Sequence, residues 1–523
     1  MKLISQTTRL FCLVLIIALS FSSCKKQEFI ILSGSENEPI EKIVKEFGDK
    51  NGYNIEFKYK GSVDIMLDLQ ANPSVYDAVW PASGIWITMG DNQKKVKYQQ
   101  SISTSPVVFG IRKSLAQKLG FIGRPVKVSD LLKAINEKQL QFMMTSASQS
   151  NSGASAYVGF LYALLGNPEY ITINDLHKPE LKSQIRALLS GINRSSGSSG
   201  WLKDLFLSGN YDAMVNYESV IIETNLELIK QGNEPLYLVY PVDGLVIADS
   251  QLGYINNGDA KKETFFKKLQ EYLLSKEVQT ELLGMGRRTG FAGEINNAPT
   301  DVFNPEWGIN TKQILSPIKL PATDVILEAL NLYQTEFRKP SFTVFCLDYS
   351  GSMEGERISK VISAMEILLK DENAKKYLLQ NSSEDIIEVI PFNNKDSLLW
   401  KVQGNKKEEL DSLLTKIKNH TAGGGTDIYS PVIMGLTEIS KIDMTKYSPA
   451  VILMTDGESN TGLNFVDLQA NWSKIGKDIP VFAIKFGDAS DNQLKQISDL
   501  TRSKVFDGTK DLISTFRKAK GYN

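Results

Sequence analysis

Residues 341–352 read SFTVFCLDYSGS, and this stretch decides the fold of the C-terminal part of the chain. Its first seven residues are mostly apolar, aromatic or β-branched, which favours a buried strand. Asp348, Ser350 and Ser352 then follow at alternate positions, directly after the predicted strand. In open α/β sheets the carboxyl ends of the strands are where ligands bind. The stretch therefore predicts an α/β sheet with a polar site at its edge.

The residues after this stretch continue the alternation of strand and helix. Apolar runs predict strands, and segments with one apolar face predict helices. Such an alternation is typical of a largely parallel sheet with crossover helices. The predicted strands are 385–392, 450–456 and 481–487, and the predicted helices are 358–369, 406–417 and 511–520.

Two further polar loops accompany the first in this block. One is GGGTD at 423–427, which opens a predicted helix, and the other is TDGE at 455–458, which ends a predicted strand. We expect all three loops at the carboxyl ends of parallel strands, where their side chains meet. Carboxylate and hydroxyl oxygens suit Mg²⁺, Ca²⁺ or Mn²⁺ rather than zinc or copper. The alternative is that these Ser, Thr and Asp residues only cap helices. The candidate ligands are Asp348, Ser350, Ser352, Thr426 and Asp456.

With its three loops in this order, the block resembles the von Willebrand factor type A domain. That resemblance implies a Rossmann-like, doubly wound fold over about 341–520. It also implies that the five candidate ligands form a metal-ion-dependent adhesion site around one cation, Mg²⁺ or else Ca²⁺ or Mn²⁺. In that family a carboxylate of a protein partner typically fills the open position of the cation.

The N-terminal half shows a second α/β alternation. Residues 28–33, EFIILS, predict a buried strand, and Ile40, Ile43, Val44 and Phe47 mark one face of a helix. The same pattern again predicts a largely parallel sheet. Further predicted strands are 53–59, 106–111, 211–215 and 236–240, and further predicted helices are 157–165 and 260–284.

Small hydroxyl residues and glycines precede several of these helices. Ser35, Ser62 and Ser152 lie in such loops, where unpaired N–H groups allow an anion to approach closely. The alternative is that they are ordinary caps and flexible loops. The segments FIILSGSENEP, STSPVVFGIRKS, SNSGAS, YDAMVNYES and YPVDG resemble two-lobed (type II) periplasmic solute-binding proteins, especially the oxyanion- and molybdate-binding branch. The resemblance implies a cleft ligand bound by Ser35, Ser62, Ser152 and Tyr217, although Glu218 beside Tyr217 is a poor neighbour for an anion.

The first residues have the pattern of a signal peptide. Lys2 and Arg9 precede an apolar run of 12 residues, 10–21, which is too short to span a membrane. Ser22, Ser23 and Cys24 follow, which resembles a bacterial lipoprotein signal with lipidation at Cys24. The alternative is an ordinary secreted protein. The expected domains are a signal peptide at 1–24, a two-lobed solute-binding-like domain at 25–292, a linker with a lead-in helix at 293–340 and the von Willebrand factor A block at 341–523.

The composition excludes several classes of protein. The 523 residues have 42% apolar and 23% charged residues and a net charge of −1, which gives no bulk attraction to nucleic acid. Two histidines, His177 and His420, exclude histidine-rich zinc chemistry. Cys346 is the one cysteine beyond residue 24, so a mature chain has no disulfide framework.

These features together predict a non-enzymatic, lipid-anchored envelope protein on the periplasmic or extracellular face. It would bind a protein partner with an exposed carboxylate through the cation, and a small solute or oxyanion in the cleft. The alternative is a solute-binding receptor of a transport system, with the C-terminal domain as a docking module. A metal-dependent hydrolase would need Glu354 or Glu458 as its base, and we find no nucleophile elbow or P-loop.

Overall fold

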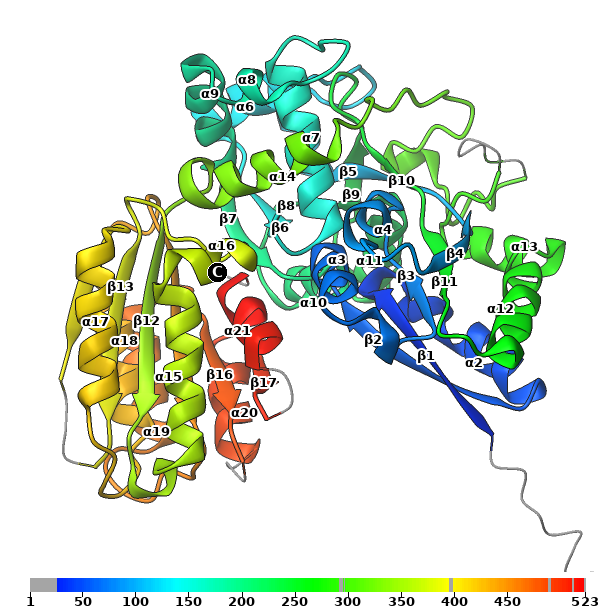
Figure 1. The fold of residues 1–523 in the computed structure, drawn as a ribbon. Coiled ribbons are helices and arrows are strands. Elements are labelled where there is room, and N and C mark those ends of the chain that lie inside the picture. Colours follow the sequence, from blue (N-terminus) through cyan, green and yellow to red (C-terminus); the bar gives the residue numbers. More distant parts are fainter. Residues whose placement is uncertain are drawn as a thin grey trace, which may run out of the picture.

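The structure is a computed structural model that describes residues 26–290, 295, 297–394, 398–487, 491–509 and 512–521. The predicted signal segment and Cys24 lie outside these residues. The described chain forms three sheets, each covered by helices (Figure 1). Two of them belong to the N-terminal half and one to the C-terminal block. The α/β prediction for both halves is confirmed.

The first lobe has the sheet order β2-β1-β3-β11-β4. Strand β1 is parallel to β2 and β3, whereas β11 is antiparallel to β3 and β4. Its strands are β1 (Gln27–Gly34), β2 (Tyr53–Lys60), β3 (Ala78–Trp80), β4 (Val96–Ser101) and β11 (Gln251–Ile255). Its helices are α2 (Glu41–Lys50), α3 (Ser62–Ala71), α4 (Ile85–Gly90), α12 (Ala260–Leu273) and α13 (Lys276–Gly284).

The second lobe has the sheet order β10-β5-β8-β6-β7, and β9 also pairs with β5. Its strands are β5 (Ser105–Arg112), β6 (Phe142–Thr145), β7 (Ile192–Ser196), β8 (Ala213–Tyr217), β9 (Leu236–Val239) and β10 (Ile247–Ala248). Its helices are α5 (Lys113–Lys118), α6 (Val128–Asn136), α7 (Asn151–Leu164), α8 (Ile173–Leu176), α9 (Pro179–Leu189), α10 (Ser199–Ser208) and α11 (Glu218–Lys230).

The two lobes expected for the N-terminal half are present, but the expectation of largely parallel sheets was wrong there. The chain leaves the first lobe after β4, builds the second lobe, and returns through β10 into β11. The strands next to these two crossings run antiparallel to their neighbours: β5 pairs with β8, β9 and β10 in this way. The chain crosses a third time after α13, where Arg288 pairs with Glu218 of the second lobe, so three segments link the two lobes.

The segment predicted as a linker packs closely on the second lobe. The phenol of Tyr157 in α7 donates a hydrogen bond of 2.8 Å to the carbonyl of Ala329 in α14 (Thr323–Leu332). Tyr333 begins a π-helical turn (Tyr333–Phe337), and its ring lies 5.3 Å from that of Tyr157, edge to face. Trp307, in the turn Pro305–Trp307, is also buried. The C-terminal block is therefore attached to the second lobe by packed structure.

The C-terminal block has the sheet order β14-β13-β12-β15-β16-β17, with β13–β14 the one antiparallel pair among them. Side chains of β12 alternate: Phe345 and Leu347 face a core with α15, α17 and α21, and Val344 and Cys346 face a core with α18, α19 and α20. The sheet is thus doubly wound, as predicted. The strands are β12 (Ser341–Asp348), β13 (Ile386–Phe392), β14 (Trp400–Gln403), β15 (Ser448–Thr455), β16 (Val481–Lys485) and β17 (Val505–Asp507). The helices are α15 (Glu356–Leu369), α16 (Asp371–Lys376), α17 (Lys407–Asn419), α18 (Tyr429–Ser440), α19 (Phe465–Ile475), α20 (Asp491–Leu500) and α21 (Leu512–Gly521).

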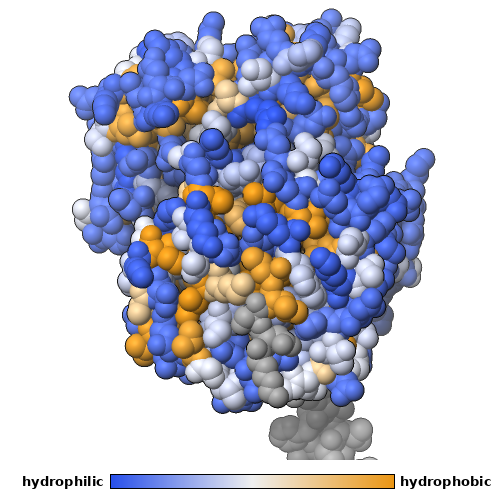
Figure 2. Space-filling model, turned by 90° about the vertical axis from the view of Figure 1, so that its left-hand side faces the viewer, coloured by the Kyte–Doolittle hydropathy of each residue, from blue (hydrophilic) through white to orange (hydrophobic). Residues whose placement is uncertain are grey.

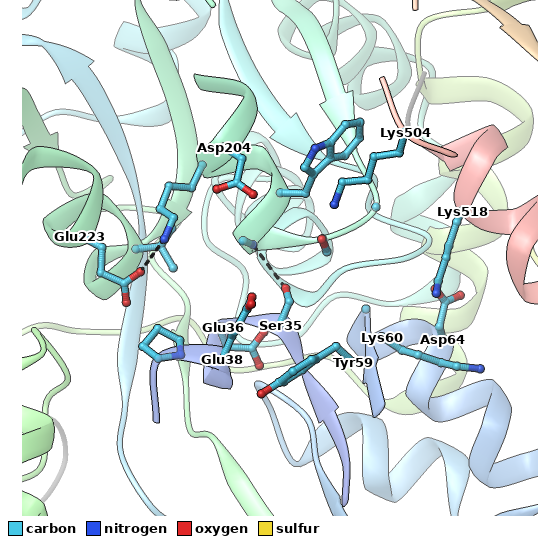
Figure 3. Close-up of a pocket in the computed structure, with 18 of the residues that line it drawn as sticks. Ser35, Glu36, Glu38, Tyr59, Lys60, Asp64, Asp204, Glu223, Lys504 and Lys518 are labelled. Atoms are coloured by element: carbon cyan, nitrogen blue, oxygen red, sulfur yellow. Dashed lines mark hydrogen bonds and ion pairs between the residues drawn. The ribbon is translucent and has the colours of Figure 1, made fainter. Parts of the chain in front are cut away.

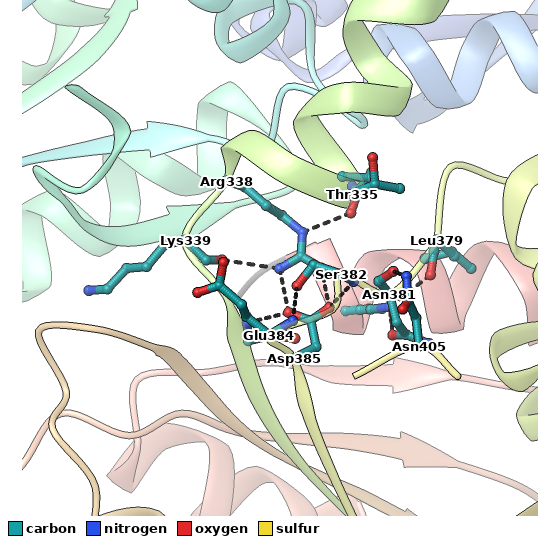
Figure 4. A network of polar contacts seen from close by, with 12 residues as sticks. Thr335, Arg338, Lys339, Leu379, Asn381, Ser382, Glu384, Asp385 and Asn405 are labelled. Carbon is teal, nitrogen blue, oxygen red and sulfur yellow. Dashed lines mark hydrogen bonds and ion pairs between the residues drawn. The ribbon is translucent and has the colours of Figure 1, made fainter. Parts of the chain in front are cut away.

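A buried polar network joins the lead-in segment to this block (Figure 4). Arg338 donates to both carboxylate oxygens of Asp385, at 3.1 and 2.5 Å. The same carboxylate accepts the backbone N–H of Ser341 at 2.7 Å and that of Ser382 at 2.8 Å. Since Asp385 is fully buried, the network fixes the start of β12 relative to α14.

The surface is mainly polar, with separate apolar patches on the side shown in Figure 2. Leu463 and Val466, which follow β15, are among the exposed large apolar residues. Within the described residues we find no helix with the length and apolar character needed to cross a membrane.

Candidate functional site

The polar edge of the C-terminal sheet brings together the loops predicted to bind a cation. Asp348 ends β12, and Asp456 directly follows β15, its parallel neighbour. The Ser352 hydroxyl donates to Asp456 Oδ1 at 2.8 Å and lies 3.1 Å from the hydroxyl of Ser350. Both carboxylates are buried, whereas Ser352 is exposed. Solvent therefore reaches the edge at Ser352.

The loop of Thr426 reaches this edge by another route than predicted. It connects α17 to α18 instead of following a parallel strand. Backbone hydrogen bonds hold it against the first loop: Gly423 N–H donates to Tyr349 O at 2.7 Å, and Gly351 N–H to Gly424 O at 3.0 Å. As a result, a methyl group on Gly457 would lie 3.4 Å from Thr426 Oγ1 and 3.7 Å from Ser352 Oγ.

The electrostatics of this edge fit a cation. Burial raises the pKa of Asp348, the hydrogen bonds from Thr455 and Ser350 oppose that rise, and the charge of Asp456 adds to it. Two buried carboxylates close enough to repel each other, beside three hydroxyls, are a donor set that a hard divalent cation satisfies. No group of three or more His, Cys, Asp or Glu side chains suited to a metal occurs in the described residues.

Two residues at this edge were missed by the sequence analysis. The Thr455 hydroxyl donates to Asp348 Oδ2 at 2.5 Å and so orients that carboxylate. Its position just before Asp456 was the available signal. Arg357, in the first turn of α15, forms an ion pair with Asp456 Oδ2. No motif marks Arg357, because the contact depends on how α15 lies against the β15 loop.

The cleft between the lobes is closed by direct contacts. The N–H of Val63 at the start of α3 donates to Gln149 O of the second lobe at 3.0 Å. Trp86 Nε1 donates to Asn151 Oδ1 at 2.7 Å, again from the first lobe to the second. A methyl group on Gly61 would lie 2.2 Å from Gln149 O, so only glycine permits this approach.

A cavity of about 580 Å³ remains beside these contacts (Figure 3). Of the four residues predicted to bind a ligand, Ser35 lines it. Ser62, Ser152 and Tyr217 are at most 2% exposed and bond to protein atoms instead. Ser62 Oγ accepts from Ala82 N–H at 3.1 Å, Ser152 Oγ lies 2.8 Å from Thr145 Oγ1 and 2.9 Å from Ser199 Oγ, and the phenol of Tyr217 accepts from Asn151 Nδ2 at 3.1 Å.

Glu218 is neutralised within the fold. Arg288 Nε donates to Glu218 Oε1 at 2.7 Å, and Nη2 to Oε2 at 2.7 Å. Both side chains are buried, so the pair is a fixed part of the interior.

The other walls of the cavity include charged residues of both lobes and of the C-terminal block. The sequence analysis did not find them, because they lie far apart along the chain. These residues are Glu36, Glu38, Lys60, Asp64, Lys203, Asp204, Glu223, Lys504 and Lys518.

Comparison with known proteins places two families on this chain. Residues 30–288 match the family model of bacterial extracellular solute-binding proteins, and residues 343–514 match that of the von Willebrand factor type A domain.

Individual relatives are distant and match only in part. A VWFA domain-containing protein of Acidianus two-tailed virus is 23% identical over 248 residues, which is 45% of this chain and 25% of the relative. Human inter-alpha-trypsin inhibitor heavy chain H3 is 28% identical over 159 residues, which is 28% of this chain and 17% of the relative. The chain thus spans about a quarter or less of the length of these curated relatives. A solved structure of the ferric binding protein from Campylobacter jejuni is 17% identical to this chain, with a TM-score of 0.42. The match covers 58% of this chain and 98% of that one.

The two family matches and the three sheets together show that this chain joins a bacterial extracellular solute-binding domain to a von Willebrand factor type A domain.

Proposed function

We propose that the protein is a non-enzymatic, lipid-anchored binding protein of the cell envelope that captures a protein partner through a divalent cation and a small solute in its cleft. One observation supports capture of a partner through a cation. Asp348 and Asp456 lie together with the hydroxyls of Ser350 and Ser352 at a solvent-accessible sheet edge. Cys24 would carry the lipid. The domain limits that we propose stay 1–24, 25–292, 293–340 and 341–523.

The cation would be Mg²⁺, or else Ca²⁺ or Mn²⁺, held by Asp348, Ser350, Ser352, Thr426 and Asp456. When bound, it would supply a positive charge with a position open to a carboxylate oxygen of the partner. Thr455 keeps the Asp348 carboxylate in place, and Tyr349 O and Gly424 O hold the loops together through backbone hydrogen bonds. The protein residues therefore position the cation and present it to solvent.

Calorimetric titration of the full chain with Mn²⁺ and Mg²⁺ tests the cation site. We expect saturable binding to the wild type and none to Asp348→Ala, because half of the carboxylate charge is lost. The control is Asp499→Ala, an exposed carboxylate paired with Lys495, which should bind like the wild type. Equal binding by Asp348→Ala and the wild type would contradict the proposed site.

A pull-down from envelope extract then tests the adhesion role. The chain from residue 25 onwards is used in Mg²⁺, in EDTA, and as Asp456→Ala. A partner retained only by the wild type in Mg²⁺ is the expected result. The same bands in all three samples would restrict the cation to a structural role.

A second function is favoured by the cavity between the lobes. The solute-binding domain is the larger of the two matched regions, and its cavity lies in the usual size range of ligand sites. The protein would then be a solute receptor of a transport system, with the von Willebrand factor A domain docking it to the complex. This reading predicts that the chain without its cation still binds solute with unchanged affinity.

A further inference from the structure

One wall of the cleft cavity belongs to the von Willebrand factor A domain. Lys504, Phe506 and Lys518 line the cavity together with residues of both lobes. Phe506 lies in β17 and Lys518 in α21, whereas Lys504 immediately precedes β17. A two-lobed domain alone would leave this side of its cleft open. Here the cavity has three walls from three parts of the chain.

Buried contacts fix this third wall against the lobes. Arg517 Nε donates to Asp64 Oδ1 at 2.7 Å, and Arg517 Nη2 donates to Ser148 O at 2.9 Å. Asp64 lies in the first turn of α3 of the first lobe, and Ser148 belongs to the second lobe. One side chain of α21 therefore holds both lobes. The ring of Trp201 also packs edge-on against Phe482 of β16, with centroids 6.2 Å apart.

The charges in the cavity are separated between its walls. Lys203 and Glu223 pair with each other at 3.2 Å, Asp64 pairs with Arg517, and Lys60 of the first lobe pairs with Asp68 at 2.8 Å. The lobes then contribute the carboxylates of Glu36, Glu38 and Asp204, while Lys504 and Lys518 enter from the A domain (Figure 3). The cavity thus has an acidic side and a basic side.

Burial shifts the pKa of one group on each side, Glu36 and Lys504, toward the neutral form. Glu36 Oε1 is buried without a hydrogen-bond partner, and burial raises the pKa of Glu36 to about 7. The ammonium of Lys504 lies 4.8 Å from the centre of the Trp201 ring. Burial and the charge of Lys518 lower the pKa of Lys504, while Asp204 and Glu38 oppose that shift. A ligand group of opposite charge would stabilise each side.

We propose that the cleft and the A domain form one composite binding site for a zwitterionic solute, either a free amino acid or a short peptide. Lys504 binds its carboxylate, and Glu36, Glu38 and Asp204 bind its ammonium group. This proposal rests on the proposed solute-binding function. It adds that the A domain contributes ligand contacts, so that solute binding and the docking of the A domain on the lobes stabilise each other.

The test is a titration of the full chain with free L-amino acids and with Gly-Xaa dipeptides. The fluorescence of Trp201 reports binding. Trp201→Phe identifies the signal of that residue among the six tryptophans. Each compound that binds is measured again as its N-acetyl and its C-amide form. We expect both blocked forms to bind about tenfold or more weakly, since each loses a charge-assisted contact. Equal affinity of blocked and free forms would overturn the proposal.

Lysine variants then test the role of the A domain. Lys504→Gln should weaken the free compound about tenfold and leave the C-amide form unchanged, because that form has no carboxylate for Lys504 to bind. Lys495→Gln, on the exposed face of α20, is the matched control and should bind like the wild type. Wild-type affinity of Lys504→Gln for the free compound would overturn the composite site.

A parallel panel of maltose, molybdate and phosphate separates this proposal from the general one. If these compounds bind and no amino acid or dipeptide does, the zwitterion proposal fails and solute binding stands. If no compound of either panel binds at millimolar concentration, both proposals fail.

Discussion

The cation edge and the cleft differ in where their polar residues come from. At the edge, Asp348 and Asp456 end neighbouring parallel strands, so strand pairing alone places them side by side. In the cleft, Ser62, Ser152 and Tyr217 lie on two lobes and form hydrogen bonds inside the closed protein. The cavity walls come from residues more than 400 positions apart, such as Tyr59 and Lys504. A site built on adjacent strand ends is local to one sheet, whereas a site built between domains depends on how they dock.

The largest loss of stability is expected where the A domain docks on the two lobes. Arg517→Ala would leave the Asp64 carboxylate buried without its partner, which costs about 3–5 kcal/mol of unfolding free energy. Denaturant unfolding followed by tryptophan fluorescence measures it. Lys485→Ala breaks a pair with an Asp491 carboxylate that is 80% exposed, and should cost less than about 1 kcal/mol. If both variants lose the same small amount, the Arg517 contact does not hold the domains together.

The next effect is a pH dependence specific to the cleft. Burial raises the pKa of Glu36 from 4.5 to about 7, so between these values the folded protein keeps a proton that the unfolded chain has lost. Stability therefore falls as the pH rises from about 4.5 to about 7, by about 3 kcal/mol in total. Glu36→Gln should remove this slope.

Unfolding free energies measured across that pH range, for Glu36→Gln and for the exposed neighbour variant Glu38→Gln, provide the comparison. Glu38→Gln should keep the slope of the wild type. A slope that survives in Glu36→Gln would assign the pH dependence to other groups.

A serine-to-alanine substitution in the cleft and one at the cation edge should have opposite effects on stability and on cation binding. Ser152→Ala removes a hydroxyl that lies within hydrogen-bond distance of Thr145 and Ser199 in the interior, and should cost about 1–3 kcal/mol of stability. Ser352→Ala removes an exposed hydroxyl and should cost less than about 0.5 kcal/mol, yet weaken Mn²⁺ binding. Thermal unfolding and calorimetry of both variants decide this. A stability loss in Ser352→Ala equal to that in Ser152→Ala would show that both serines are structural.

The smallest effect concerns the arginine at the cation edge. Arg357 pairs with Asp456 and competes with a cation for that carboxylate, so Arg357→Ala should bind Mn²⁺ more tightly. Because the Arg357 side chain is 39% exposed, the gain should be no more than about fivefold. Lys360→Ala, one turn further along α15, is the control. Weaker Mn²⁺ binding in Arg357→Ala would mean that the arginine supports the site.

The sequence by itself determined most of the C-terminal domain. The nearly continuous apolar run in 341–347 indicated a buried strand, and the Asp and Ser residues after it marked the edge of the sheet. It named Thr426 but could not show how its loop reaches the edge, because a loop between two helices is held there only by backbone hydrogen bonds to the first loop. In the N-terminal half the residues indicated α/β structure, but not the antiparallel strands beside the two crossings, since β11 is separated from its partner β3 by the whole second lobe.

Only the tertiary structure decided the composition of the cleft. Serine and tyrosine before a helix look alike in sequence whether they line a cavity or bond within the interior, and lobe closure placed Ser35 in one group and Ser152 in the other. Nothing near Lys504, Arg517 or Lys518 in the sequence points to a solute site. They reach the cavity because the docking of two domains is set by the sum of many contacts far apart along the chain, whereas a motif reports only neighbours.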